Sequence, residues 1–389
     1  MSATVAVTGI GLLTAAGEGL VPIAAALAAG RSALGALPEA VARGLPHRLG
    51  GRFPAELVPE AGPDRAVLAA LRAARAALAE AALPAGARLA LAVGTGLGAS
   101  ERLEALGPGA SGALDPELWS PAALGREVGG ALSIPAERRR VFVVTCLSSL
   151  CALEHARAEL ELGRADAVLV LGVETLSRTI QAGFSALGAL SKTATAERLA
   201  VEDGILLGEA ACALVVEREE GARGRGARVR VRITGQAMRV DGRHLTSPNP
   251  EGEGLAAAIA GAGADGVWGA APRRDARSAG EGGGPGSPIA AERASLLGMG
   301  CGAEPHSHTV LVTAPASPGY AAQYARALGA DWRGRVESWE GVTGHCLGAS
   351  TAVGVAFAAE RLGRGAGGSA LLLSVGFGGQ SGATRLEAP

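Results

Sequence analysis

The order of its predicted elements places this sequence of 389 residues in the α/β class, as a layered fold. Short runs rich in β-branched residues alternate with longer runs rich in alanine and leucine, as strands and covering helices do. Several of the short runs are apolar throughout, which is typical of a sheet covered by helices on both faces. We therefore expect buried strands between layers of helices.

Eight segments predict strands and five predict helices. The strands are Thr4–Thr8, Leu89–Val93, Val141–Val144, Ala167–Leu171, Cys212–Val216, Val229–Thr234, Thr309–Val312 and Ala370–Val375. The helices are Arg65–Ala82, Leu147–Leu162, Gly254–Ala260, Tyr320–Leu328 and Ala349–Leu362. Two stretches interrupt this order. Residues around Gly107–Pro121 predict a loop, and the Gly-rich, Pro-containing stretch near 270–290 predicts a flexible surface insertion.

Composition and charge exclude several classes of protein. Lys and Arg number 36 against 37 Asp and Glu, so the chain lacks the basic surplus of a general nucleic-acid binder. Hydrophobic residues make up 48% and charged residues 19%, which excludes a disordered chain. The N-terminal segment predicts a buried strand rather than a signal peptide, and no apolar run reaches the ~18 residues of a membrane span. We expect a cytoplasmic protein without a membrane partner.

Cofactor and metal motifs are weak in this sequence. The five cysteines form no CxxC pair and their number is odd, so they predict neither a disulfide framework nor a metal site. The GxGxxG spacing occurs at 107–112 and 261–266, but neither copy follows a predicted strand, which disfavours nucleotide binding. We expect no cofactor.

Cys146 stands between the predicted strand Val141–Val144 and the predicted helix Leu147–Leu162. At a helix N-terminus, free N–H groups and the helix dipole stabilise a thiolate and can hold the oxyanion of a thioester adduct. This environment is the one that a cysteine nucleophile for acyl transfer needs. The alternative is that Cys146 is a small buried hydrophobic residue.

Two further segments near the C-terminus carry candidate site residues. His345 lies in GVTGHCLGAS at 341–350, next to a glycine that allows close approach to a ligand. A neutral imidazole there can donate to a thioester or carboxylate oxygen, although a structural role is the alternative. Phe377 stands among the glycines of SVGFGGQSG at 374–382, a type of turn that can cradle phosphate.

Eight ordered blocks of this sequence resemble those of the β-ketoacyl synthase family. They are TGIG at 8–11, GTGLG at 94–98, Thr145–Cys146, GFSALGALS at 183–191, EDGILLGEAA at 202–211, HLTSPNPEGEG at 244–254, VTGHCLGA at 342–349 and GFGG at 376–379. The resemblance implies a thiolase-like five-layer αβαβα fold made of two similar halves, and a dimer. Residues 1–235 would form the half with Cys146, and residues 236–389 the half with His345 and GFGG.

The family resemblance also implies a reaction and the residues that perform it. Enzymes of this family take an acyl group from acyl carrier protein onto the cysteine, decarboxylate malonyl carrier protein and join the two by Claisen condensation. Cys146 maps onto the nucleophile and His345 onto the second family histidine. Phe377 maps onto the gating phenylalanine, whose N–H would complete the oxyanion hole with that of Cys146. Thr343 and Gly378, beside these residues, are the expected substrate contacts.

Three positions depart from the family pattern. Pro315 stands where the first active-site histidine is expected, and it can neither donate a hydrogen bond nor act as a base. Glu340 replaces a lysine five residues before His345, and Gln323 replaces the acidic residue that pairs with that lysine. All three belong to the unit that activates malonyl decarboxylation. We expect that step to be impaired or altered, and acyl transfer to Cys146 to be retained.

Three functions remain open from the sequence. The first is a ketosynthase-like enzyme that loads Cys146 for carbon–carbon bond formation in fatty-acid or polyketide-type biosynthesis. The second is an acyltransferase that has lost condensation, and the third is a chain-length-factor-like subunit of an active ketosynthase. Cys146 argues against the third, and Pro315 against an ordinary version of the first. The expected partners are acyl carrier protein with acyl or malonyl thioesters, and a second copy or another ketosynthase in a dimer.

Overall fold

Nine ranges of the chain are described by the computed structural model. They are residues 4–62, 64–107, 119–195, 203–246, 249–263, 308–313, 318–329, 335–364 and 368–389. Pro315, residues 108–118 of the predicted loop and the insertion expected at 270–290 lie outside the described residues.

The first half of the chain forms five strands of a large sheet. They are β1 (Val5–Thr14), β5 (Leu89–Gly94), β6 (Arg139–Phe142), β7 (Ala167–Glu174) and β8 (Ala210–Arg218). Their order across the sheet is β6-β5-β7-β8-β1. β5 pairs in parallel with β6 and β7, whereas β8 runs antiparallel to both β7 and β1. Every residue of β7 is buried, as its continuous apolar run predicts.

The second half repeats this arrangement. Its strands are β9 (Val231–Val240), β10 (His308–Val312), β11 (Arg335–Glu337), β12 (Ser369–Gly376) and β13 (Gln380–Glu387). Their order is β11-β10-β12-β13-β9, with the same parallel and antiparallel pairings as in the first half. β1 and β9 pair at the junction. The expected division between residues 235 and 236 falls within β9, and the assignment of 1–235 and 236–389 stays a prediction.

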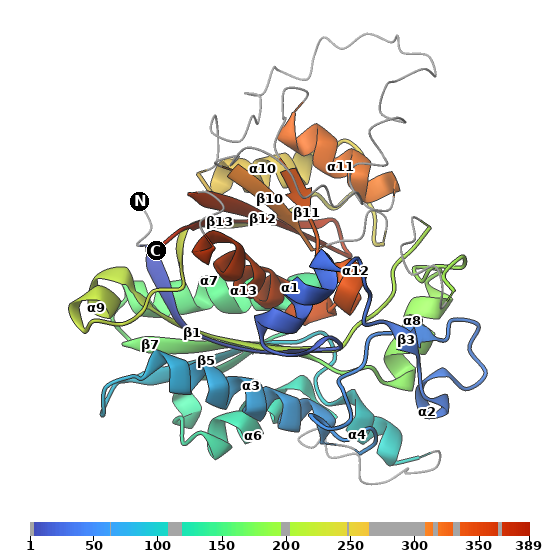
Figure 1. Ribbon diagram of the computed structural model, residues 1–389, viewed down its shortest axis with the longest axis horizontal. Coiled ribbons are helices and arrows are strands. Elements are labelled where there is room, and N and C mark those ends of the chain that lie inside the picture. The colour runs from blue at the N-terminus through green and yellow to red at the C-terminus, as the bar shows by residue number, and fades with distance from the viewer. Residues whose placement is uncertain are drawn as a thin grey trace.

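Helices form three layers around the two halves of the sheet (Figure 1). α3 (Arg65–Ala81) and α6 (Pro121–Ala131) cover the outer face of the first half, and α10 (Glu253–Gly261) and α11 (Pro318–Leu328) cover the outer face of the second. The helices between the halves are α7 (Ser148–Glu161) and α13 (Ser350–Gly363). The expected five-layer αβαβα fold of two similar halves is therefore confirmed.

Shorter elements complete the described part of the chain. They are β2 (Gly17–Glu18), α1 (Leu20–Ala28), β3 (Gly35–Ala36), α2 (Glu39–Ala42), β4 (Leu49–Gly50), α4 (Ser100–Ala105), α8 (Arg178–Ala186), α9 (Glu219–Gly224), α12 (Glu340–Thr343) and the 3₁₀ turns η1 (Ala136–Arg138), η2 (Thr145–Leu147) and η5 (Leu347–Ala349). Within the described ranges, no helix is long and apolar enough to cross a membrane.

Within the described residues, the structure shortens one predicted strand and adds five that the sequence did not indicate, β2, β3, β4, β11 and β13. β6 ends at Phe142, so the segment predicted as Val141–Val144 leaves the sheet two residues early. The N–H of Val144 instead donates to the Ser148 hydroxyl at 2.9 Å, which starts the turn into α7. β13 escaped prediction because its buried residues 381–384 are small or polar and form no strongly apolar run.

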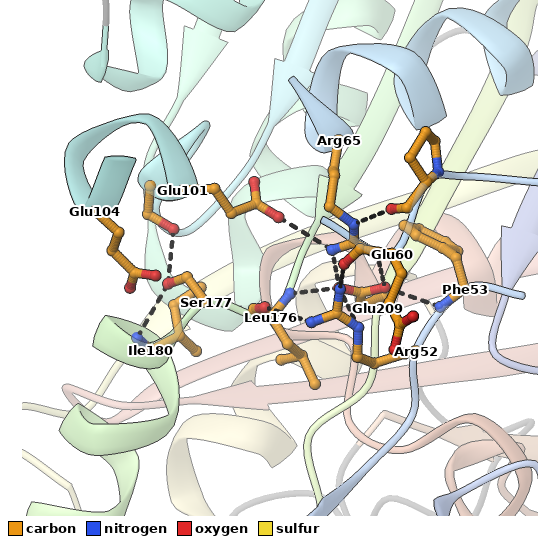
Figure 2. A network of polar contacts seen from close by, with 12 residues as sticks. Arg52, Phe53, Glu60, Arg65, Glu101, Glu104, Leu176, Ser177, Ile180 and Glu209 are labelled. Carbon is orange, nitrogen blue, oxygen red and sulfur yellow. Dashed lines mark hydrogen bonds and ion pairs between the residues drawn. The ribbon is translucent and has the colours of Figure 1, made fainter. Parts of the chain in front are cut away.

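A buried ion pair ties α3 to the strand that carries the GEAA block. Arg65 donates to both oxygens of Glu209, at 2.6 and 2.8 Å. The same carboxylate accepts the backbone N–H groups of Phe53 at 2.8 Å and Leu176 at 2.9 Å. Figure 2 shows Glu101 approaching Arg65 from the other side, at 3.1 Å. Because Glu209 joins three separate segments, it holds together the loops that surround the start of β8.

Glu209→Ala is expected to lower the free energy of unfolding by about 3–5 kcal/mol. The substitution leaves the buried Arg65 guanidinium with Glu101 as its remaining described ion-pair partner, and the loss of a buried bidentate partner costs far more than a lost surface contact. Denaturant unfolding measures the loss. The matched control is Asp166→Ala, which removes a half-exposed partner of Arg88 and should cost about 1 kcal/mol or less. Equal losses in the two variants would contradict this account.

Candidate active site

Cys146 lies in η2, the tight turn that joins β6 to α7. Thr145 before it has a left-handed backbone with φ +46°. The hydroxyl of Ser148 donates to the Thr145 carbonyl at 2.7 Å and accepts the N–H of Val144, so one side chain closes the turn. Cys146 is 6% exposed and stands at the N-terminal end of a central helix. The expected position at a strand-to-helix corner is therefore observed.

The second half of the fold contains an equivalent turn. η5 precedes α13 as η2 precedes α7, and Leu347 has φ +47°, matching Thr145. Gly348 thus occupies the position that Cys146 occupies in the first half. The two turns meet in the centre of the molecule, where the N–H of Ala352 donates to the Ser149 hydroxyl at 3.1 Å. The start of α13 therefore lies beside the start of α7, the helix that follows Cys146.

The backbone of His345 is fixed between two of the sequence blocks. Gly344 has φ +80°, and a Cβ on it would lie 2.7 Å from the carbonyl oxygen of Leu207. The N–H of His345 donates to Leu206 at 2.7 Å, and its carbonyl accepts the N–H of Gly208 at 2.9 Å. EDGILLGEAA and VTGHCLGA are therefore adjacent in space, and together they orient the imidazole.

Cys146, His345 and Glu340 form a continuous chain of polar contacts. Nε2 of His345 lies 3.2 Å from Sγ of Cys146, and its Nδ1 lies 2.8 Å from Oε1 of Glu340. All three residues are buried, with 6%, 4% and 6% exposure in the order Cys146, His345, Glu340. The sequence indicated Glu340 only as a lost lysine. The sequence did contain a signal for this contact. An acidic residue stands five positions before a histidine, and the glycine between them allows the chain to reverse.

The charges of these residues act on one another inside the protein. Burial raises the pKa of Glu340, and the nearby His345 opposes that rise. Burial alone would lower the pKa of His345, but the Glu340 carboxylate and the Cys146 sulfur raise it well above its usual range. The imidazolium form of His345 is therefore stabilised by the two groups that flank it.

Phe377 and the GFGG turn lie against the nucleophile. A Cβ on Gly376 would lie 3.4 Å from Cβ of Cys146, so the backbone just before Phe377 passes directly beside that residue. The ring of Phe377 stacks on Phe184 of the GFSALGALS block, with centroids 5.5 Å apart. The structure thus brings together Cys146, His345 and the predicted gate. That the Phe377 N–H completes an oxyanion hole stays a prediction.

The two expected substrate contacts have their polar groups engaged within the protein. The N–H of Gly378 donates to Leu245 at 2.6 Å. Thr343 is fully buried, and its hydroxyl donates to the Gly344 carbonyl at 2.9 Å. Their roles in binding substrate stay predictions, and the structure places Thr343 behind His345 in the chain turn rather than beside an open space.

Apolar side chains pack around Cys146. The buried members of this cluster are Leu37, Val41, Ala42, Leu147, Leu150, Leu176, Ile180, Leu190, Ile205, Leu207 and Leu347, and Phe184 and Met238 pack against them. A charged group buried among these side chains would be costly, because none of them offers it a partner.

Gln323 is not part of this constellation. Gln323 lies buried in α11, and its backbone carbonyl faces Gly252, just before α10. No described contact joins Gln323 to Glu340 or His345. The interpretation of Gln323 as a member of the same unit is therefore not supported by the contacts. The described hydrogen bond of the Glu340 carboxylate is with His345, and not with a residue of α11.

Glu174, at the end of β7, is a buried carboxyl group next to η5 and the GTGLG block. Its Oε1 accepts the N–H of Gly348 at 3.2 Å and also that of Gly96 in the GTGLG block. Burial raises the pKa of Glu174 to about 8, against the lowering effect of these N–H donors. The group is therefore protonated in the folded protein at neutral pH and links η5 to the first half of the fold.

Glu174→Gln is expected to flatten the dependence of stability on pH. Between the unfolded value of 4.5 and the folded value of about 8, the native state binds more protons than the unfolded state. The free energy of unfolding therefore falls as pH rises through this window, and glutamine removes that contribution while it keeps an acceptor oxygen. Urea unfolding at several pH values, compared between the two proteins, measures the difference. Parallel curves would contradict the shifted pKa.

Comparison with known proteins gives matches in sequence and in structure. Residues 2–222, more than half of the chain, match the family model described as beta-ketoacyl synthase, N-terminal domain. The 3-oxoacyl-[acyl-carrier-protein] synthase 2 of Mycobacterium tuberculosis (strain ATCC 25618 / H37Rv) is 32% identical over 192 residues. That alignment covers 44% of this chain and 45% of the relative, so the chain matches less than half of the relative's length.

Two solved structures have the same fold. The ishigamide ketosynthase/chain length factor matches with a TM-score of 0.77, and AntDE:AntF, a type II PKS acyl-carrier protein in complex with its ketosynthase, with a TM-score of 0.76. Each match covers 100% of both chains at 20% sequence identity.

Proposed function

This chain belongs to the β-ketoacyl synthase family, and from that premise we propose that it takes an acyl group from an acyl carrier protein onto Cys146. The reaction would serve fatty-acid or polyketide-type biosynthesis. The observation that carries the proposal is the 3.2 Å contact between Sγ of Cys146 and Nε2 of His345. A thiol and an imidazole at this distance can exchange a proton, which is what activates a cysteine nucleophile.

Acylation of Cys146 follows from the arrangement of these groups. His345 holds the thiol proton as an imidazolium, and the Cys146 thiolate attacks the carbonyl carbon of the carrier thioester. The negative charge that develops on the carbonyl oxygen lies near the N-terminus of α7, where free N–H groups stabilise it. His345 then returns the proton to the departing thiol of the carrier. The gate formed by Phe377 and Phe184 would close over the acyl chain within the apolar cluster.

The second half-reaction departs from the family pattern in our proposal. Carbon–carbon bond formation with a malonyl thioester needs decarboxylation, which the family pattern assigns partly to a histidine where this chain has Pro315. We propose that this step is impaired. A chain-length-factor-like role without catalysis is less favoured, because such a role would need neither the Cys146–His345 contact nor the burial of both residues.

The proposed partners are an acyl carrier protein as the acyl donor and a second subunit, either another copy of the chain or another ketosynthase. The support is the presence of such partners in the similar structures: AntDE:AntF contains an acyl-carrier protein with its ketosynthase, and the ishigamide protein is a ketosynthase/chain length factor.

The acyl transfer is tested by incubating the protein with an acyl carrier protein thioester and following its intact mass. The acyl mass should appear on the wild-type chain and be absent from Cys146→Ala. His345→Ala should slow acylation by about 10²–10⁴, the usual contribution of a general acid–base residue. Cys151→Ala is the matched control and should acylate normally, because burial raises the pKa of the Cys151 thiol to about 11. Acylation that persists in Cys146→Ala, or none in the wild type, would refute the proposal.

A further inference from the structure

The carboxylate of Glu340 is placed to decide what His345 does after Cys146 has been acylated. We propose that Glu340, His345 and Cys146 act as a triad that transfers the acyl group to a hydroxyl or amino acceptor, rather than to a malonyl carbanion. This inference rests on the proposed acylation of Cys146. It concerns the second substrate, and Glu340 enters it as the positioning residue of His345.

The tautomer of His345 follows from its two neighbours. An ionised carboxylate only accepts hydrogen bonds, so Nδ1, 2.8 Å from Oε1 of Glu340, must carry a hydrogen. Once His345 has returned its proton to the departing carrier thiol, the imidazole is neutral and has a single N–H, so Nε2, 3.2 Å from Sγ of Cys146, carries a lone pair. A lysine at position 340 would impose the opposite arrangement, because an ammonium group only donates and would leave the hydrogen on Nε2.

The position of Glu340 is dedicated to this contact. Its backbone carbonyl accepts the N–H of Gly344 at 2.8 Å, which closes the short turn between Glu340 and His345. Its second oxygen, Oε2, has no hydrogen-bond partner among the described residues. The preceding Trp339 is fully buried and packs on Phe357 of α13, so the turn is anchored to the central helix. Glu340 is therefore held against His345 by the backbone, and its only described side-chain hydrogen bond is the one to that residue.

A base at Nε2 suits an acceptor that carries its own proton. An alcohol approaches the acyl-Cys146 carbonyl, its O–H bond breaks, and the proton moves to Nε2. The new C–O bond forms as the C–S bond breaks, which leaves an ester, a Cys146 thiolate and an imidazolium paired with Glu340. That ion pair is the state that attacks the next carrier thioester, so the cycle closes without another reactant. An amine reacts in the same way through its N–H.

Condensation needs the opposite property. When malonyl thioester loses CO₂, negative charge develops on its thioester oxygen, and stabilising that enolate requires a hydrogen-bond donor. The lone pair of Nε2 is an acceptor and cannot serve there. The replacement of a lysine by Glu340 therefore changes the chemistry that His345 supports, and the effect is independent of the size or shape of the acyl chain.

The first experiment follows the fate of an acyl group loaded onto Cys146 from its carrier protein. Ethanol is the added acceptor, and malonyl carrier protein is the competitor. Wild-type acyl-enzyme should form ethyl ester, and lose its acyl group to water, faster than it releases CO₂ from the malonyl thioester. Glu340→Lys and Glu340→Gln should each slow ester formation at least tenfold, since neither stabilises the imidazolium. Glu337→Gln, the same change in a carboxylate that pairs with Arg361, is the matched control and should behave as wild type.

The second experiment reads the tautomer directly by ¹⁵N NMR of the histidine ring in a Cys146→Ala background, where no thiol is present. At a pH high enough to make the ring neutral, the hydrogen should reside on Nδ1 of His345 with Glu340 present and move to Nε2 in Glu340→Lys. This signature separates a positioning role from a merely structural one. It also remains readable when no acyl-enzyme forms.

Three outcomes overturn the inference. An unchanged tautomer in Glu340→Lys, ester formation that is the same in Glu340→Gln as in wild type, or CO₂ release that outpaces ester formation would each do so, with acylation of Cys146 left intact. Failure of the wild type to acylate at all would overturn the proposed function, and the inference with it. The two failures are therefore distinguishable by the intact mass of the protein.

Discussion

The close meeting of α7 and α13 is the constraint on which the site depends. Each helix starts at a tight turn that contains a residue with a left-handed backbone. The two turns contact each other in the middle layer, between the two halves of the sheet. A glycine lets η5 pack closely on the first half of the sheet: a Cβ on Gly172 of β7 would lie only 2.9 Å from Cα of Ala349 at the end of η5. Because the turns cannot separate without opening this interface, Cys146 and His345 are held in contact by the packing of the whole core rather than by a mobile loop.

The same packing determines the electrostatics. Burial removes water from Cys146, His345 and Glu340 together, and interactions between charges in such surroundings are stronger than in solvent. A carboxylate buried without a partner would be costly, so the pairing of Glu340 with His345 compensates both groups. Glu209 and Arg65 follow the same rule farther from the site, where the pair holds segments and faces no candidate nucleophile. Burial with a partner is therefore common to both pairs, and of the two it is the Glu340–His345 pair that lies beside a thiol.

Much of the fold could be predicted from the sequence, because strands buried on both faces leave continuous apolar runs, as in β7 and β8. Cys146 could be placed at a helix start for the same reason. The partnership of Glu340 with His345 could not, since it depends on a turn at Gly344 with φ +80° that carries the chain back on itself. Sequence comparison with a family pattern indicated a lost lysine at Glu340, whereas the structure shows a gained contact. Glu340 is thus a lost ammonium group in the family pattern and a carboxylate partner of His345 in this structure.

The two halves of the fold contribute different groups to the proposed reaction. The first half supplies the nucleophile from η2, and the second supplies the imidazole and its carboxylate from the segment that leads into η5, where Gly348 stands in place of a second cysteine. In the proposed acylation, the first half supplies Cys146 and the N-terminus of α7, and the second half supplies His345, so Glu340 reaches this step only through the imidazole. In the proposed second step, the acceptor depends on the protonation of Nε2, which Glu340 sets directly through Nδ1. One buried carboxylate beside the histidine would therefore redirect the acyl group to another acceptor without any change in the turn that carries the nucleophile.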